Sequence, residues 1–443
     1  MAYIENLISG MFPFSLLIFC GILISVYGKF FQFTKFFASF KLCVKAFREK
    51  GNNKKGISSF QSACTALSAT VGTGNIAGVA GAVALGGAGA VFWMWVSAFL
   101  GMAIKFAEVK FSVIYREKQG EEYMGGPMYY IKNGLPRVFG ILSLLFCFFC
   151  IPAVFFTGNI TQVNAAASLL SENKITHILF GVVFAILTAI VIWGGNKRIG
   201  LVTEKVVPIM SVIYIFLSFG VIIKNFEALP EAFGMIFKGA FSPEAVTGGA
   251  VGSCFTAMFI GASRGVFSNE AGLGTSAMAH SAAYDAKADT QGLFGIFEVF
   301  VDTVVICTIT ALTILCSGVN IEYGRIASSE LVSSALSFVY GDMASILLIF
   351  MMSIFAFSSV IGWAFYGNIC SKFLFGKKGV VIFKVIYPVF CLIGAVLSSE
   401  IPWRMSSFLN GLMLIINLPV LLILWNKKGE KSDRKITGKI EHW

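Results

Sequence analysis

The sequence predicts an all-α protein that crosses a lipid bilayer about eleven times, and three observations support this prediction. Of the 443 residues, 57% are hydrophobic and only 13% are charged, whereas soluble domains carry about 25% charged residues. The apolar residues form continuous runs of about twenty, the length of a membrane-spanning helix. Phe and Gly number 45 and 46, as expected where Phe faces lipid and Gly lets helices pack closely. We therefore expect neither a soluble enzyme nor a β-barrel, whose strands would alternate over about ten residues.

The apolar runs and the basic residues between them predict the topology. The runs lie at 12–32, 61–85, 89–114, 139–168, 176–194, 204–223, 245–283, 291–316, 333–369, 378–398 and 405–426. Loops on one side of the bilayer carry 25 Lys and Arg residues, and loops on the other side carry five. By the positive-inside rule, the N-terminus is expected outside and the C-terminus in the cytoplasm. The net charge of +11 then reflects topology and contact with membrane lipid, and no nucleic-acid partner is expected.

Two spans carry Gly and small polar residues at a depth where lipid-facing backbone must be helical. These runs are Ser68–Gly78 in the second span and Gly261–Gly274 in the seventh. Non-helical backbone is tolerated at this depth only where it is buried in protein or lines a cavity. We therefore expect both helices to be broken.

The two broken spans divide the chain into repeats. With the first span set aside, they open two successive groups of five spans, and because five is odd, the second group is inverted relative to the first. Paired Gly-interrupted helices in inverted halves indicate a secondary transporter with its site near the bilayer midplane. The expected divisions are an N-terminal helix and basic loop at 1–57, a first repeat at 58–225, a second repeat at 240–426 and a basic tail at 427–443.

The break in the second span offers chemistry of its own. Free amides of Thr73 and Gly74 at a half-helix N-terminus are suited to a carboxylate, and the carbonyls that precede them are suited to a cation. Asn75 adds a neutral side-chain oxygen. The alternative is a helix-packing face built from Gly74 and Gly78.

Several charged residues lie inside apolar spans, where charges are costly and usually paired. Arg264, Asn269 and Glu270 fall together in the seventh span, and we expect Arg264 and Glu270 to form a structural or gating ion pair. Lys105 and Glu108 are three residues apart near the cytoplasmic end of the third span. We expect these two side chains to extend together toward the membrane surface.

The eighth span carries two carboxylates four residues apart, Glu298 and Asp302, which therefore share one helix face. They suggest a cation or proton pathway, or hydrogen bonds to polar groups of other helices. Catalytic chemistry has little support, because the chain has only three His and its ten Cys show no metal-ligand spacing. We expect no enzymatic activity.

Long motifs along the chain can be compared with a known family. They are Thr65–Ser68, Val71–Val79, Ala90–Trp95, Gly125–Tyr130, Arg264–Gly272, Val301–Thr303 and Ala356–Trp363. Together they resemble the alanine or glycine:cation symporter family over essentially the whole chain. The resemblance implies the five-plus-five inverted-repeat core of the sodium:neurotransmitter transporters, preceded by one extra helix.

The resemblance also implies an activity: sodium-coupled uptake of alanine or glycine across the cell inner membrane by alternating access. Sodium is then the coupling ion, and no other cofactor is expected. The alternative is a proton-coupled amino-acid symporter that uses Glu298 or Asp302.

By similarity to that wider fold, a sodium ion would lie between two segments. One supplies the carbonyls of Ser68 and Val71, and the other supplies Phe355, Ser358 and Ser359. A second cation is implied at the Thr70 carbonyl and Asn75. The residues implied in substrate binding are Thr70, Gly72, Thr73, Gly74, Asn75, Gln162, Phe267, Ser268 and Trp363.

Overall fold

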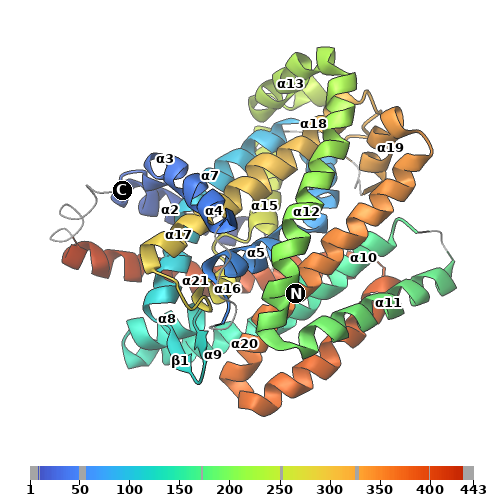
Figure 1. The fold of residues 1–443 in the computed structure, drawn as a ribbon. Helices are drawn as coiled ribbons and strands as arrows, with labels where there is room; N and C mark the ends of the chain where they lie inside the picture. Colours follow the sequence, from blue (N-terminus) through green and yellow to red (C-terminus); the bar gives the residue numbers. More distant parts are fainter. Residues whose placement is uncertain are drawn as a thin grey trace.

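The computed structural model describes residues 8, 10–48, 56–170, 173–249, 253–324, 329–398 and 400–432. Within these ranges the chain is helical except for loops and one antiparallel hairpin of β1 (Glu117–Gln119) and β2 (Glu122–Met124). Figure 1 shows the helices gathered into one bundle. The predicted all-α class is confirmed.

The helices in the first half of the chain follow the predicted spans except at 36–48 and 127–134, where helices form in predicted loops. They are α2 (Met11–Tyr27), α3 (Phe31–Thr34), α4 (Phe36–Arg48), α5 (Ser59–Thr70), η2 (Thr73–Asn75), α6 (Ala77–Gly86), α7 (Gly89–Ile114), α8 (Pro127–Gly134), η3 (Arg137–Phe139), α9 (Gly140–Phe155), η4 (Phe156–Ile160), α10 (Thr161–Ala167), α11 (Lys174–Trp193) and α12 (Gly195–Lys224). The second predicted span is broken as expected, because α5 and α6 meet at a bend of 55°.

The second half adds one helix that the hydropathy pattern did not predict, the amphipathic α13. Its helices are η5 (Phe226–Ala228), α13 (Leu229–Phe241), α14 (Glu244–Thr247), α15 (Cys254–Asn269), α16 (Thr275–Ser281), α17 (Ala288–Val299), η6 (Phe300–Cys307), α18 (Thr308–Cys316), α19 (Ser329–Tyr340), α20 (Met343–Val396) and α21 (Glu400–Ser432). Figure 1 shows α13 at one end of the bundle, beside the end of α12.

The seventh predicted span is also interrupted. Between α15 and α16, Glu270, Gly272 and Gly274 adopt positive φ angles of 55°, 89° and 76°. Gly adopts this conformation readily, whereas a non-Gly residue such as Glu270 does so uncommonly. The predicted break is therefore present at residues 270–274.

Seven of the described helices are long and apolar enough to cross a bilayer, and the bent pair of α5 and α6 makes an eighth. Helix α2 is shorter, with 17 residues, and α20 runs for 54 residues with a kink at Gly376, where φ is 64°. Helix α20 therefore covers most of the two predicted spans 333–369 and 378–398, while α19 covers the start of the first. The number of eleven spans stays a prediction.

The centre of the bundle is formed around α5, which packs against α12, α16 and α20. Its start is fixed by a capping box, in which Ser58 Oγ accepts the Gln61 N–H at 3.2 Å and Gln61 Oε1 accepts the Ser58 N–H at 3.1 Å. Two π-helical segments lie nearby: η4 contacts α20, and η6 contacts η2. Such turns are rare and frequently mark functional sites.

Candidate functional site

The break after α5 releases a group of backbone carbonyls. The last helical hydrogen bond runs from the Val71 N–H to the Leu67 carbonyl at 2.8 Å, and the next one, from Asn75 N–H to the Gly72 carbonyl at 3.2 Å, belongs to η2. The carbonyls of residues 68–71 therefore lie beyond the helical ladder, as at any helix C-terminus. All four residues are buried, so these oxygens face protein rather than bulk solvent.

Two amide side chains hold the break in shape. Asn75 Oδ1 accepts the Gly72 N–H at 2.8 Å. Gln162 Oε1 accepts both the Thr73 N–H at 3.1 Å and the Thr73 hydroxyl at 2.8 Å. The structure thus brings Gln162 to the break, as predicted. It corrects the expectation that the Thr73 amide is free, because a buried N–H without a partner is costly and Gln162 satisfies it.

We expect Gln162→Ala to weaken amino-acid binding by about 1 to 3 kcal/mol, since the Thr73 N–H and hydroxyl would both lose their acceptor. A calorimetric titration in saturating sodium measures this change. The matched control is Asn164→Ala, because Asn164 lies one half-turn further and donates to the Gly394 carbonyl, away from the break. Equal affinities of the Gln162→Ala variant and the wild type would contradict the assignment.

Two adjacent serine hydroxyls of α20 have no partner among the described residues, and one of them, that of Ser359, lies at the break. Ser358 Oγ and Ser359 Oγ are fully buried and have no hydrogen-bond partner among the described residues. This is unusual in a helix, where a buried Ser normally bonds back to the preceding turn. Ser353 on the same helix does so, donating to the Ile349 carbonyl at 2.7 Å. The two orphan hydroxyls therefore indicate a missing partner at this position.

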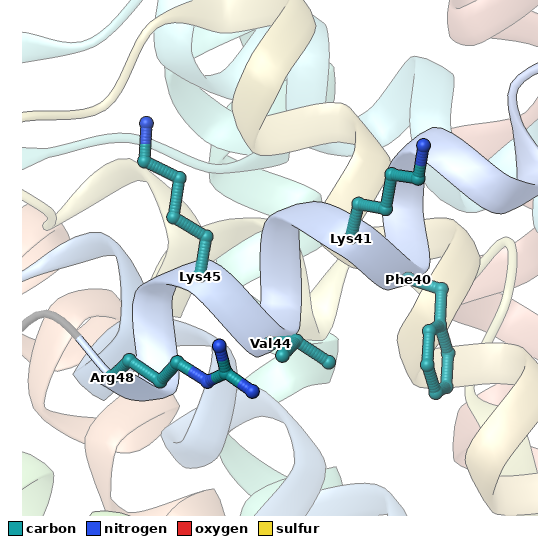
Figure 2. A pocket seen from close by; sticks show the side chains of 5 residues that line it. All are labelled: Phe40, Lys41, Val44, Lys45 and Arg48. Atoms are coloured by element: carbon teal, nitrogen blue, oxygen red, sulfur yellow. The ribbon is translucent and has the colours of Figure 1, made fainter.

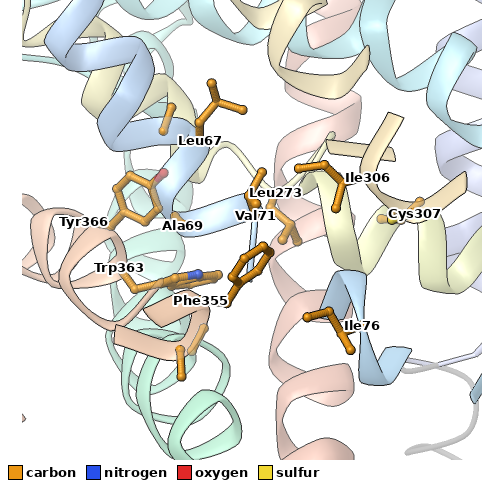
Figure 3. Close-up of a cluster of buried hydrophobic side chains, with 14 of the residues drawn as sticks. Leu67, Ala69, Val71, Ile76, Leu273, Ile306, Cys307, Phe355, Trp363 and Tyr366 are labelled. Carbon is orange, nitrogen blue, oxygen red and sulfur yellow. The ribbon is translucent and has the colours of Figure 1, made fainter. Parts of the chain in front are cut away.

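Glycines show how closely α20 approaches the break. A Cβ added at Gly72 would lie 2.2 Å from Ser359 Oγ and 2.9 Å from Gln162 Oε1. A Cβ added at Gly362 would lie 2.4 Å from Ser68 Oγ. Figure 3 shows Phe355 and Trp363 of α20 directed at the segment that contains Ala69 and Val71. The predicted cation ligands Ser68, Val71, Phe355, Ser358 and Ser359 are thus buried along two segments in contact.

Trp363 and Tyr366 of α20 contribute two further unsatisfied polar groups. The Trp363 ring lies where a side chain at Gly158 would be, since a Cβ there would come within 2.2 Å of Trp363 Cβ. Neither Trp363 Nε1 nor the Tyr366 hydroxyl has a hydrogen-bond partner among the described residues. Gly158 and Tyr366 were not identified from the sequence. The sequence offered a signal only for Tyr366, which lies one helical turn beyond Trp363.

The second break places Phe267 and Ser268 on the other side of η2. A Cβ added at Gly74 would lie 3.4 Å from the Phe267 ring, which in turn lies 5.0 Å from the Trp403 ring. Asn75 Nδ2 donates to Ser268 Oγ at 3.0 Å and to Asp302 Oδ1 at 2.7 Å. Of the predicted substrate residues, Gly72, Thr73, Gly74 and Asn75 at the break thus lie beside Gln162, Phe267 and Ser268, whereas Trp363 packs against Gly158 and Thr70 bonds within α5.

Asp302 is held by neutral hydrogen-bond donors. Its carboxylate accepts from Asn75 Nδ2, from Ser268 Oγ at 2.7 Å and from Thr303 Oγ1 at 2.8 Å. The sequence left two alternatives for Asp302, a cation or proton pathway and hydrogen bonds to polar groups of other helices. The contacts of Asp302 match the second alternative. Both polar atoms of the Asn75 amide therefore have protein partners, because Oδ1 accepts from the Gly72 N–H and Nδ2 donates to Asp302. The second cation at Thr70 and Asn75 stays a prediction.

The charges of α7 do not reach the membrane surface as expected. Lys105 and Glu108 are fully buried. Lys105 Nζ lies 3.3 Å from Glu298 Oε1, and His280 Nε2 lies 3.1 Å from Glu298 Oε2. Glu108 Oε1 accepts from Asn417 Nδ2 at 2.7 Å. The predicted surface pair is wrong because α16, α17 and α21 cover this face of α7 and supply internal partners.

We expect Lys105→Ala to destabilise the protein by about 3 to 5 kcal/mol, because the buried Glu298 carboxylate loses its lysine partner. The double variant Lys105→Met/Glu298→Gln should recover most of this loss, since it removes both charges. Thermal unfolding of the purified protein in detergent measures both effects. A single variant as stable as the wild type would show that the pair is not needed.

The predicted ion pair of the seventh span is also wrong. The Arg264 guanidinium lies 5.1 Å from the Trp403 ring centroid, a cation–π contact. Glu270, turned away by its left-handed backbone, accepts from the Thr275 hydroxyl at 2.6 Å. Asn269 donates to a hydroxyl of η6 at 3.1 Å. These residues fix the second break rather than forming a charge pair.

Comparisons with known proteins agree with this geometry. The model of the sodium:alanine symporter family matches residues 1–433. The sodium/alanine symporter AgcS of Methanococcus maripaludis is 38% identical over 426 residues, covering 95% of this chain and 93% of AgcS. The amino-acid carrier protein AlsT of Bacillus subtilis is 37% identical over 405 residues, covering 90% of this chain and 85% of AlsT.

Solved structures share the fold at low sequence identity. The structure of MhsT in complex with L-phenylalanine superposes with a TM-score of 0.59 at 14% identity, covering 82% of this chain and 88% of MhsT. The manganese transporter of Eremococcus coleocola reaches a TM-score of 0.52 at 16% identity, covering 83% of this chain and 78% of that chain. This likeness supports the transporter fold expected from the paired breaks.

Proposed function

The chain belongs to the sodium:alanine symporter family, a family of multi-pass membrane transporters, and from this premise we propose that it carries alanine or glycine into the cell together with sodium. The observation that carries the proposal is the pair of orphan hydroxyls at Ser358 and Ser359 of α20, both fully buried, with Ser359 Oγ only 2.2 Å from where a Cβ at Gly72 would lie in the break after α5. Hard cations bind oxygen ligands, which hydroxyls and backbone carbonyls supply.

Sodium is favoured over a proton as the coupling ion by the chemistry of these donors. Serine hydroxyls and backbone carbonyls do not titrate near neutral pH, so a site built from these oxygens is suited to a metal ion rather than to a proton. Moving one positive charge across the membrane is worth about 2.3 kcal/mol per 100 mV, which is roughly a fiftyfold accumulation of substrate. The sodium concentration gradient adds to this driving force.

The substrate is proposed to bind between η2 and α15. The Gly74 amide is suited to the carboxylate, and Gln162 orders the Thr73 backbone beside it. Phe267, whose ring is tilted against that of Trp403 and lies in contact range of Gly74, limits the volume left for a side chain. A small site of this kind rejects large side chains by volume, which favours alanine or glycine. No catalytic step is part of this proposal.

Proton coupling is the second candidate, and Asp302 is the observation that favours it. This buried carboxylate contacts the break directly through Asn75 Nδ2 at 2.7 Å. A change in its protonation would alter the hydrogen bonds that join η2 to η6. The same uptake experiment separates the two candidates.

Uptake of radiolabelled alanine and glycine into proteoliposomes tests the function. Sodium and proton gradients are imposed separately at a fixed membrane potential, and protein-free liposomes provide the background. We expect accumulation with an inward sodium gradient alone. Accumulation that follows only the proton gradient would replace sodium by the Asp302 alternative, and no uptake under either gradient would contradict amino-acid transport.

The topology is proposed together with the function. The breaks near the start of the segments 58–225 and 240–426 support their assignment as inverted repeats. The distribution of Lys and Arg supports an outer N-terminus and a cytoplasmic C-terminus, and we propose the inner membrane as the location. A fluorescent protein fused to the C-terminus is expected to fluoresce, because the fusion folds in the cytoplasm. A dark fusion with an active periplasmic reporter at the same position would reverse this orientation.

A further inference from the structure

Helix α4 presents three separate sectors around its axis, at about 100° per residue. The sector that packs on the protein holds Phe36, Ser39, Leu42, Cys43 and Ala46. A neighbouring sector is apolar and exposed, and it holds Phe37, Phe40, Val44 and Phe47. The third sector holds only small or basic residues, which are Ala38, Lys41, Lys45 and Arg48. No acidic residue occurs between Phe36 and Arg48.

The exposed apolar sector is large for a surface helix. Phe37 is 76% exposed, Phe47 is 64% exposed and Phe40 is 48% exposed. Between α2 and α4, Phe30 and Phe33 are also half exposed and extend the apolar surface toward the end of α2. Large exposed apolar patches mark surfaces that contact another protein or a membrane.

The basic residues border this apolar sector along its length. Figure 2 shows Lys41 and Lys45 extending from one side of α4, with Phe40 and Val44 on another side. Together with Arg48, they line a hollow of about 430 Å³. A row of cations next to a row of exposed aromatic and aliphatic side chains is the pattern of a helix that lies in a membrane interface.

We propose that α4 lies in the plane of the membrane surface and binds an anionic phospholipid. Lys41, Lys45 and Arg48 would contact the phosphate headgroup, while Phe37, Phe40 and Phe47 enter the acyl-chain region. Two observations favour lipid over a protein partner. The charge complements an anionic headgroup, and the apolar sector is continuous with the end of the membrane helix α2.

The position of α4 connects this lipid to the transport core. The Phe47 ring lies 5.7 Å from the Phe60 ring at the start of α5. The Phe36 ring lies 4.7 Å from the Phe300 ring at the start of η6, which also contains Asp302. A lipid that holds α4 at the membrane surface would therefore stabilise the Ser59 end of α5 and the start of η6.

Native mass spectrometry of the purified full-length protein tests the proposal. The protein is titrated with phosphatidylglycerol, with phosphatidylcholine of the same acyl chains and with glycerol 3-phosphate, which lacks the chains. We expect phosphatidylglycerol to bind at least tenfold more tightly than phosphatidylcholine, and glycerol 3-phosphate not to bind. The triple variant Lys41→Gln/Lys45→Gln/Arg48→Gln should lose this preference, since each basic side chain at an anionic surface is worth about fivefold.

A charge-matched variant and two smaller changes keep the test decisive. Lys197→Gln/Lys377→Gln/Lys378→Gln removes the same charge from exposed positions outside α4 and should keep the preference. Lys41→Gln alone should lower the affinity for phosphatidylglycerol by about fivefold. This single variant therefore tests the proposal even if the triple variant expresses poorly. Phe37→Ser should weaken binding of both phospholipids, because it removes apolar contact only.

Three results would overturn the proposal. The first is a preference that persists in the α4 triple variant, and the second is an equal loss in the charge-matched variant. The third is a wild-type dimer that Phe37→Ser dissociates without any phospholipid preference, which would assign the apolar sector to a second copy of the chain. None of these readings depends on which ion or amino acid is transported.

Discussion

Replacing Gly72 by Ala is expected to reduce sodium-dependent amino-acid uptake by about 5- to 150-fold, and Gly72→Val is expected to abolish it. Backbone strain is not the reason, because the φ angle of Gly72 is −142°, an extended conformation that any residue adopts. The reason is a steric clash of the added side chain. The added Cβ would lie 2.2 Å from Ser359 Oγ and 2.9 Å from Gln162 Oε1. Overpacking of this kind costs about 1 to 3 kcal/mol, and it displaces groups from both the proposed cation site and the proposed substrate site.

Initial uptake rates in proteoliposomes measure this effect at equal protein incorporation. Gly78→Ala is the matched control, because a Cβ at Gly78 meets no described neighbour within 4 Å. Gly74→Ala should have an intermediate effect, since its Cβ would reach only ordinary contact with Phe267, at 3.4 Å. If Gly72→Ala and Gly78→Ala transported equally well, the close approach of α20 to the break would not matter for function.

The double variant Ser358→Ala/Ser359→Ala is expected to raise the sodium concentration for half-maximal uptake by about 10- to 100-fold. Each hydroxyl removed takes away one neutral oxygen ligand, and a loss of about 0.7 to 1.4 kcal/mol for each of the two gives this factor. Coupling is reciprocal, so substrate affinity should fall at low sodium and recover when sodium is raised. Ser353→Ala is the control on the same helix, because its hydroxyl is already satisfied by the Ile349 carbonyl.

Uptake over a sodium series, with lithium in place of sodium and with pH varied separately, provides the measurement. A correctly folded double variant with unchanged sodium dependence would remove α20 from the cation site. The cation would then be sought at Asn75 and Asp302, whose side chains meet at 2.7 Å.

The fold could be predicted well because it depends on patterns that a sequence displays directly. Continuous apolar runs give the helices, and Gly-rich runs give the breaks at residues 71–74 and 270–274. Where prediction was less accurate, the pattern itself was ambiguous. One example is the span predicted at 333–369, where the structure has the separate helix α19 before α20 begins at Met343.

The partners of buried polar groups were harder to predict, since they depend on tertiary contacts between distant helices. Lys105 and Glu108 look like a local pair at i and i+3, yet Lys105 lies beside Glu298 of α17. Thr73 was expected to offer a free amide, yet Gln162, 89 positions away, accepts it. The π-helical turns η4 and η6 have no hydropathy signature, although they position Gly158 and Asp302.

The central claim is that sodium binds between the broken helix α5 and the serines of α20, and equilibrium binding of ²²Na⁺ to the purified protein tests it most directly. The account predicts saturable binding to the wild type and to Ser353→Ala, strengthened by alanine or glycine. It predicts affinity at least tenfold weaker in Ser358→Ala/Ser359→Ala, because two ligands are lost. Equal ²²Na⁺ affinity in the wild type and the double variant would contradict it.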